Sequence, residues 1–271
     1  MAATSTAASK RTLQLDDVDL KLFEAGDGPP LLALHGLLEL PGWQEYHERL
    51  AQRFHVVAPS HPGFAGSTRP DWMESVDDLA YFYLDLIDAL GLAPTNVVGH
   101  SFGGWIAAEM AVRCPGALRK LVLADAVGIR PVEEAAGRPG GYISDWLVLE
   151  PEPLRKLAWH DPASGGRLKL PGEEATSDEE LAAIISNRVS ATVYGWRPFF
   201  YNPRLLHWLK RISVPTLVVW GRHDGVVPLS AGEAYARRIP NARLEVLEGA
   251  AHLPHLELPD EFSRLAADFL S

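Results

Sequence analysis

Short, mostly apolar runs recur along the chain, and each of them ends at a glycine, a proline or a polar residue. The runs lie at residues 31–34, 54–58, 95–98, 121–124, 216–220 and 244–247. A strand that is buried on both faces has an almost continuous apolar sequence, and such strands are typical of parallel sheets. The runs therefore predict a mostly parallel sheet.

Segments with helical spacing separate these runs. Residues 76–90 and 260–270 repeat apolar side chains every three or four positions. Residues 102–113 follow a glycine-rich turn and stop before Pro115, which favours a third helix. Strands that alternate with helices imply right-handed crossovers, so we expect an α/β fold with a doubly wound sheet. Ahead of this pattern, residues 12–24 predict two strands joined by a tight turn.

The alternation stops between residues 128 and 211, where no buried strand pattern occurs. Helical pieces are expected there at residues 153–158 and 178–188. A segment of this length is too long for a simple loop, so it predicts an inserted helical unit that covers the sheet. The expected organisation is a disordered tail at 1–11, a core domain formed by 12–127 and 212–271, and a helical insertion at 128–211.

Composition narrows the possible partners. Lys and Arg number 25 against 35 Asp and Glu, which gives a formal charge of −10 and argues against nucleic acid or an acidic membrane surface. The single cysteine, Cys114, excludes an intrachain disulfide and a cysteine-rich metal site. The sequence also contains no metalloprotease, dinucleotide or P-loop motif, so we expect no metal and no cofactor. The N-terminus lacks the pattern of a signal peptide, and we expect a cytoplasmic protein with a small-molecule substrate and no membrane partner.

One glycine-rich turn carries a candidate nucleophile. Residues 99–103, Gly-His-Ser-Phe-Gly, fit the pattern G-x-S-x-G between an expected strand and an expected helix. A sharp strand-to-helix turn of this kind places the Ser101 hydroxyl above the edge of the sheet. A serine hydroxyl is a weak nucleophile at neutral pH, so it needs a base, and the base needs an orienting acid.

Two later loops offer these partners. Residues 221–228 contain Asp224 and follow one expected strand, and residues 249–252 end in His252 after the next strand. Loops at the carboxyl ends of parallel strands meet at one edge of the sheet, so both loops are expected beside Ser101. Asp125, at the end of another apolar run, stays open as an alternative acid, and His255 as an alternative base.

The order of serine, acid and histidine resembles that of the α/β-hydrolase fold superfamily, and the resemblance extends over residues 31–270. His35-Gly36 is similar to the oxyanion-hole motif of that superfamily, and residues 59–67 are similar to the loop after its next strand. The resemblance implies that Ser101 is the nucleophile, Asp224 the acid and His252 the general base. It also implies an oxyanion hole made of the main-chain N–H groups of Leu37 and Phe102. The insertion at 128–211 looks like the cap, or lid, of this superfamily.

The nucleophile type indicates a reaction class. Relatives that are dehalogenases or epoxide hydrolases carry aspartate at the turn, whereas a serine with a base performs acyl transfer. We therefore expect hydrolysis of a carboxylic ester of a small to medium, fairly apolar substrate through an acyl-enzyme, with a lactone as a closely related substrate. Aromatic residues of the insertion are candidates for an apolar pocket, and an equal alternative is that they fasten the cap to the sheet. The candidates are Trp146, Trp159, Trp196, Phe199 and Phe200.

Two other functions remain open at this level. One is a C–C bond hydrolase similar to the meta-cleavage product hydrolases, in which Arg130, Arg188 or Arg197 would hold the carboxylate of the substrate. The other is a ligand receptor on a hydrolase fold, with little or no turnover. An intact triad does not separate the receptor from an enzyme, so kinetic measurements are needed. Oligomeric state is not predicted by the sequence.

Overall fold

The computed structural model describes residues 8–38, 41–130, 144, 147–163, 177–196 and 198–271. Its strands form a single eight-stranded sheet in the order β1-β2-β4-β3-β5-β6-β7-β8. The strands are β1 (Ser9–Leu15), β2 (Val18–Ala25), β3 (Pro30–Leu34), β4 (His55–Pro59), β5 (Thr95–His100), β6 (Leu118–Ala124), β7 (Thr216–Gly221) and β8 (Ala242–Leu247). From β4 to β8 every neighbouring pair is parallel, as the apolar runs predict.

The first two strands form an antiparallel hairpin that extends the edge of the sheet. Leu15 pairs with Val18 across the tight turn, and β2 then pairs antiparallel with β4. Strand β1 begins at Ser9, inside the segment predicted to be a disordered tail, so the expected boundary at residue 11 is wrong by three residues. The side chains at the start of β1 are exposed, and this edge strand is held by main-chain pairing that leaves no apolar pattern in the sequence.

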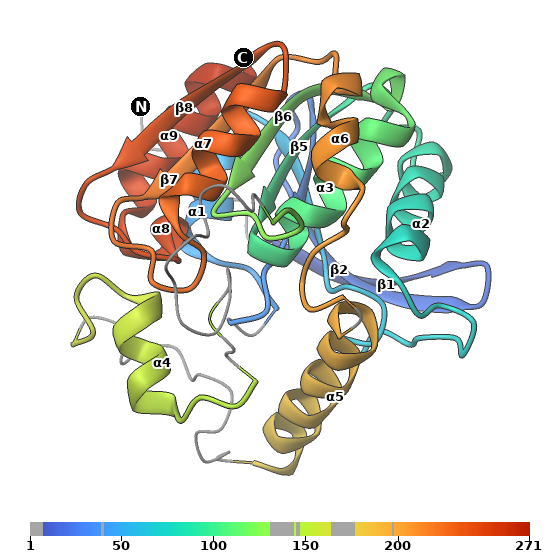
Figure 1. Ribbon diagram of the computed structural model, residues 1–271. Helices are drawn as coiled ribbons and strands as arrows, with labels where there is room; N and C mark the ends of the chain where they lie inside the picture. Colours follow the sequence, from blue (N-terminus) through green and yellow to red (C-terminus); the bar gives the residue numbers. More distant parts are fainter. Residues whose placement is uncertain (1–7, 39–40, 131–143, 145–146, 164–176, 197) are drawn as a thin grey trace, which may run out of the picture.

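Helices cover both faces of the sheet, which gives the three layers seen in Figure 1. The helices are α1 (Glu45–Leu50), α2 (Val76–Ala89), α3 (Ser101–Arg113), α4 (Pro151–Ala158), α5 (Asp178–Gly195), α6 (Leu205–Trp208), α7 (Leu229–Arg238), α8 (Pro254–Glu257) and α9 (Pro259–Leu270), with the 3-10 helices η1 (Pro115–Ala117) and η3 (Leu209–Arg211). Helices α2, α3 and α7 pack on one face, and α1 and α9 pack on the other. None of the described helices is long and apolar enough to cross a membrane.

The central strands supply side chains to both layers of helices. In β6, Leu121 and Leu123 belong to the core beneath α3, whereas Val122 and Ala124 belong to the core beneath α9. This alternation explains why the strand sequence is apolar at consecutive positions, since each face of the sheet is covered. The predicted doubly wound α/β fold is therefore confirmed.

The inserted segment lies between β6 and β7 in the chain. Its helices α4 and α5 lie apart from the three layers, at one end of the molecule (Figure 1). Helix α5 begins after Ser177, whose hydroxyl accepts the N–H of Glu180, and it extends seven residues beyond the predicted end at 188. Near the end of the insertion, Leu205 of α6 and Leu209 of η3 are buried, and Arg211 donates to the Val112 carbonyl at the end of α3. These contacts attach the end of the insertion to the sheet domain, and the boundary at residue 211 stays a prediction.

Candidate active site

The candidate nucleophile is on the turn between β5 and α3. Ser101 has a φ of 49°, a left-handed conformation that is strained for a non-glycine residue and recurs at functional sites. The turn is tight enough to require glycine at two of its positions. A Cβ at Gly99 would lie 2.4 Å from the Gly103 carbonyl oxygen, and a Cβ at Gly103 would lie 2.2 Å from the Leu34 carbonyl oxygen. The glycines of the G-x-S-x-G pattern therefore allow α3 to start directly against β3.

The three predicted triad residues meet at the carboxyl edge of the sheet. His252 Nε2 lies 2.9 Å from Ser101 Oγ, and His252 Nδ1 lies 2.9 Å from Asp224 Oδ2. All three side chains are buried. Asp224 Oδ1 also accepts the N–H groups of Val226 and Val227, both at 2.8 Å, so the loop after β7 fixes the carboxylate. A neutral imidazole that donates from Nδ1 and accepts at Nε2 satisfies this chain of hydrogen bonds.

The two rival residues have different surroundings. Asp125 Oδ1 accepts the N–H of Gly221 at 2.9 Å, whereas the hydrogen-bonded partner of His252 is Asp224. The ring of His255 is buried and lies 4.0 Å from the His100 ring and 4.9 Å from the Tyr46 ring, on the side of α1. The hydrogen-bonded chain from Ser101 therefore runs through His252 to Asp224, and through neither rival.

A buried network fixes the loop after β3. His35 Nε2 accepts the N–H of His61 at 3.0 Å, and His35 Nδ1 donates to the Gly36 carbonyl at 2.6 Å. His61 Nε2 in turn donates to the His35 carbonyl at 2.9 Å, while its Nδ1 lies 2.5 Å from the Tyr83 hydroxyl. Burial raises the pKa of the Tyr83 hydroxyl well above its usual range, so this group stays a neutral donor. These contacts join the loop after β3 to His61 and Tyr83 and hold the His35 ring beside the site.

This loop runs next to the nucleophile. A Cβ on Gly36 would lie 3.2 Å from Ser101 Cβ, so the main chain of the loop passes against the serine. Gly103 N–H donates to the His35 carbonyl at 3.0 Å, which ties the loop to the first turn of α3. Among the described residues, no acceptor is bonded to the main-chain N–H of Leu37 or Phe102. The two predicted oxyanion donors therefore lie on segments that meet at Ser101, and within the described part of the chain neither N–H group takes part in the main-chain hydrogen bonding.

His100 has a structural role that the sequence analysis did not identify. Its Nε2 donates to the main-chain carbonyl of His252 at 2.7 Å, which connects the serine turn directly to the loop of the base. His100 occupies the unspecified position of G-x-S-x-G, so the motif gives no signal for it. Only the proximity of two distant loops reveals the contact.

The inserted segment contacts the same loops. The end of α4 accepts two main-chain bonds, from His252 N–H to the Ala158 carbonyl at 3.1 Å and from Gly225 N–H to the Leu157 carbonyl at 3.0 Å. Helix α5 lies on the loop that follows β4. The side chains of Ser186 and Ser190 donate to the Gly63 carbonyl, at 2.6 and 2.8 Å. The insertion is thus anchored on both sides of the Ser101 turn.

The predicted pocket aromatics fall into different environments. Trp159 is buried, and it follows Ala158, whose carbonyl accepts the His252 N–H. Phe200 is also buried, and its ring lies 6.5 Å from the Phe102 ring. Phe199 is partly buried against Phe200. Trp196 is 49% exposed and lines a separate surface groove of about 380 Å³ that contains no triad residue. Trp146 lies outside the described residues.

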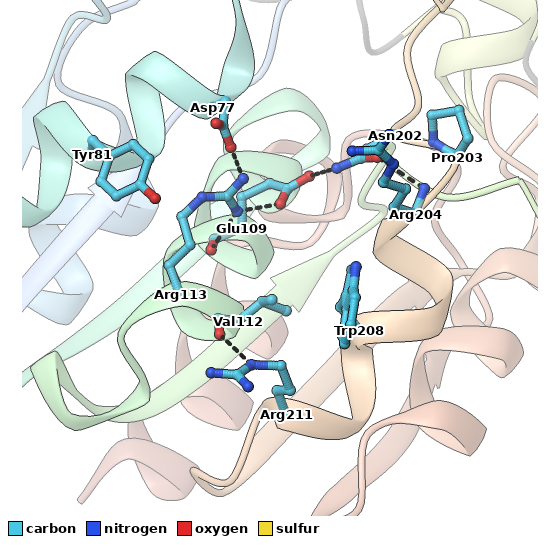
Figure 2. Close-up of a pocket in the computed structure, with 10 residues that line it drawn as sticks. All are labelled: Asp77, Tyr81, Glu109, Val112, Arg113, Asn202, Pro203, Arg204, Trp208 and Arg211. Carbon is cyan, nitrogen blue, oxygen red and sulfur yellow. Dashed lines mark hydrogen bonds and ion pairs between the residues drawn. The ribbon is translucent and has the colours of Figure 1, made fainter.

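A larger groove, of about 680 Å³, lies behind α3 and contains none of the triad residues. Figure 2 shows that Glu109 is the hub of its polar contacts. The buried Glu109 carboxylate accepts from Trp105 at 3.0 Å, from Asn202 at 2.8 Å and from Arg113 at 2.5 Å. Burial nevertheless raises the pKa of Glu109, although the hydrogen bonds from Asn202 and Trp105 oppose the shift. The Asn202 bond attaches the end of the insertion to α3, the helix that begins at Ser101, whereas Trp105 and Arg113 lie on α3 itself.

Comparison with known proteins places this geometry in a family. A family model described as alpha/beta hydrolase fold matches residues 29–259, and the chain belongs to that family. The 2-hydroxy-6-oxo-6-phenylhexa-2,4-dienoate hydrolase of Comamonas testosteroni is 31% identical over 283 aligned positions, which cover 98% of this chain and 96% of the relative. The 2-hydroxymuconate semialdehyde hydrolase of Pseudomonas putida is 29% identical and is aligned over 92% of this chain and 90% of its own length.

Solved structures give the same fold. A bacterial membrane phospholipase A aligns with 97% of this chain and 86% of its own, at a TM-score of 0.77 and 24% identity. A variant of the meta-cleavage product hydrolase CumD from Pseudomonas fluorescens aligns with 96% of both chains, at a TM-score of 0.70 and 24% identity. At these identities the structural comparison supports the fold and leaves the substrate open.

Proposed function

We propose that this protein is a serine hydrolase in which Ser101 is the nucleophile, His252 the general base and Asp224 the orienting acid. The observation that carries the proposal is the continuous chain of hydrogen bonds from Ser101 Oγ through both nitrogens of His252 to Asp224. In the chemistry of such a triad, the base must reach the nucleophile and the acid must hold the base in one tautomer. Both conditions are met by these contacts.

The reaction on an ester proceeds in two halves. His252 Nε2 takes the Ser101 proton as Oγ bonds to the carbonyl carbon, and the carbonyl oxygen becomes an oxyanion. The N–H groups of Leu37 and Phe102 are proposed to stabilise that oxygen, together with the positive end of α3. The protonated His252 then gives its proton to the leaving alcohol, and an acyl-enzyme remains on Ser101. Water, deprotonated by His252, releases the acid and restores the serine.

The proposed substrate is a carboxylic ester of small to medium size. The part of 128–211 that contacts the Asp224 and His252 loops is proposed to act as a cap over the site, with Trp159 and Phe200 the aromatics best placed near it. Buried aromatic side chains and a buried triad favour a substrate with an apolar part. A lactone presents the same carbonyl and ring oxygen to the same groups.

A second candidate substrate is a vinylogous dienone acid that is cleaved at a C–C bond. It is supported by the relatives named for dienoate and muconate semialdehyde hydrolysis, which align along nearly the whole chain. Such a substrate carries a carboxylate that needs a cationic or polar partner. Two of the candidate partners already make contacts within the protein: Arg130 lies over the Tyr201 ring at 5.7 Å, and Arg188 donates to the Leu147 carbonyl. The side chain of Arg197 lies outside the described residues.

A substrate panel tests the proposal and separates the candidates. The kcat/KM values for p-nitrophenyl esters of increasing acyl length, for lactones and for a dienone acid are compared, with Ser101→Ala as the control for each substrate. We expect ester turnover that Ser101→Ala reduces by at least about 10⁴-fold. A kcat/KM more than tenfold higher for the dienone acid than for every ester would select the C–C hydrolase. Absence of turnover on all three classes would contradict the proposal and favour the receptor.

A further inference from the structure

Asp125 stands next to the triad without belonging to it. It follows β6 directly, is fully buried and has a φ of 45°, a left-handed conformation that aspartate tolerates better than most residues. One carboxylate oxygen of Asp125, one of Asp224 and one ring nitrogen of His252 all lie within 4.8 Å of one another. The two carboxyl groups therefore share one buried space beside the base.

Two carboxylates at this separation and burial do not both carry a charge, because their repulsion and desolvation are too costly. Their surroundings decide which one is ionised. Asp224 has three donors, the N–H groups of Val226 and Val227 and the Nδ1–H of His252. Asp125 has one donor, the N–H of Gly221 on Oδ1, and its buried Oδ2 has no donor among the described residues. A buried, ionised oxygen without a donor is strongly unfavourable, whereas an O–H at Oδ2 requires only an acceptor.

We propose that Asp125 is a positioning residue, a neutral carboxylic acid whose Oδ2–H donates to the Asp224 carboxylate and thereby moderates the basicity of His252. This inference rests on the assignment of Asp224 and His252 in the proposed function. It gives every oxygen of the pair a partner, and it leaves a single negative charge beside the imidazole. The hydrogen bond also fixes the loop after β7 to the end of β6, so the acid is held on two strands.

The electrostatic surroundings of Asp125 agree with this geometry. Burial, followed by the charge of Asp224, raises the pKa of the Asp125 carboxyl well above its usual range, and the Gly221 N–H opposes the shift. The third carboxyl facing this space is Glu257, which raises the pKa of Asp125 further and accepts the Ala251 N–H at 2.7 Å. His252 donates its Nδ1–H to Asp224, and the ring of His100 lies 5.3 Å from the His252 ring.

Asp125→Asn is the decisive variant because it replaces the neutral acid by a neutral amide of the same shape. Its amide oxygen accepts from Gly221 and its NH₂ donates to Asp224. If Asp125 is neutral, the variant removes no charge, and the apparent pKa of His252 moves by less than about 0.3 unit. If Asp125 is ionised, the variant removes a negative charge near the imidazole and lowers that pKa by about one unit or more.

Asp125→Ala is the variant to compare with Asp125→Asn, because it removes the proposed donor to Asp224 altogether. It leaves Asp224 with a less stabilised charge, which favours the imidazolium, so the apparent pKa of His252 is expected to rise by about 0.5 to 1 unit. The acid limb of the pH–rate profile then moves to higher pH. If Asp125→Ala only damaged the structure, the labelling rate would fall at every pH and the apparent pKa of His252 would not shift. Asp125→Asn would then not differ from Asp125→Ala in that pKa.

Two readouts keep this test separate from the substrate question. The first is the pH dependence of Ser101 labelling by a fluorophosphonate, and the second is NMR titration of the His252 imidazole in a Ser101→Ala background. A downward shift in Asp125→Asn, or no difference between Asp125→Ala and the wild type, overturns the proposal. A labelling rate that depends on a divalent ion and falls with a chelator also overturns it, because a bound cation would require both carboxylates to be ionised. Failure of Ser101 to react at all contradicts the proposed function, while the NMR titration still reports on Asp125.

Discussion

At the scale of single residues, the proposed role of Ser101 as the nucleophile depends on which atoms of His252 are already hydrogen-bonded. Nδ1–H is directed at Asp224, and the main-chain carbonyl of the same residue accepts from His100, so ring and backbone are both fixed. The remaining ring nitrogen faces Ser101 Oγ. A base held in this way does not reorganise during proton transfer, which is the condition for efficient catalysis by preformed polar groups.

Replacing Asp224 by asparagine is expected to reduce kcat/KM by about 10⁴-fold, because the amide can stabilise the wrong tautomer of His252 and provides no charge for the imidazolium. The measurement is steady-state turnover of a p-nitrophenyl ester, with Asp71→Asn on the exposed surface as a matched control. A loss of less than tenfold in Asp224→Asn would mean that another acid serves His252, and Asp125 would be the first candidate.

At the scale of elements, the site depends on how closely α3 approaches β3. The first turn of the helix lies directly against the Leu34 and His35 carbonyls, and Gly103 N–H donates to the latter. The position of Ser101 is therefore set by packing of a helix start against a neighbouring strand. The same contact holds the main chain of Leu37 in place, since the loop begins where β3 ends.

Gly103→Ala tests this packing. The new methyl group would lie 2.2 Å from the Leu34 carbonyl oxygen and 2.7 Å from the His35 carbonyl oxygen, so main chain must move. We expect the free energy of unfolding to fall by about 3 kcal/mol, the range of severe core overpacking, with a loss of activity in the molecules that remain folded. Urea unfolding measures the change. Gly116→Ala is the control, because nothing lies within 4 Å of a Cβ there, and equal stability losses in the two variants would contradict the account.

Local sequence patterns predict much of the fold, and they also predict that Ser101, Asp224 and His252 lie at one edge of the sheet. The strands before Ser101 and Asp224 are fully buried and therefore mostly apolar in sequence, whereas the strand before His252 is partly buried and contains Glu245. A glycine lies at or near the end of each of these strands and marks the turn. The start of β1 at Ser9 left no such signal, because an exposed edge strand is held by its main chain. The contacts of His100 and Asp125 were not predictable either, since they join loops that are far apart in the sequence.

At the scale of the whole molecule, the strand order places the site. Strand β3 pairs with β4 on one side and with β5 on the other. The connections after β3 and after β4 therefore run in opposite directions along the sheet, and the loops after β3 and β5 leave it side by side. Ligands of open α/β sheets bind at such a point, where the strand order reverses. The later strands β7 and β8 then bring Asp224 and His252 to the same edge, as Figure 1 shows for the arrangement of the strands.

The buried carboxyl groups of this edge also affect stability as a function of pH. The folded protein keeps a proton on Asp125 that the unfolded chain has released above a pKa of about 3.9. Its contribution to the free energy of unfolding therefore falls as pH rises from that value towards the raised pKa. Above the unfolded pKa we expect the stability of the wild type relative to Asp125→Asn to fall as pH rises, by at most about 1.4 kcal/mol per pH unit while the folded protein keeps the proton.

Urea unfolding of both proteins at several pH values measures this difference. Asp71→Asn again serves as the control, since an exposed carboxyl contributes little to the pH dependence. A difference between wild type and Asp125→Asn that stays constant over this range would show that Asp125 is ionised in the folded protein.

The central claim is that Ser101 is the activated nucleophile of this protein. Intact-mass spectrometry after treatment with a fluorophosphonate probe tests it most directly, with ester turnover followed in the same samples. The account predicts a single adduct on the wild type with loss of turnover in proportion to labelling, and neither adduct nor turnover for Ser101→Ala. An unlabelled wild type, or an Ser101→Ala variant that is labelled or hydrolyses the ester as fast as the wild type, would contradict it.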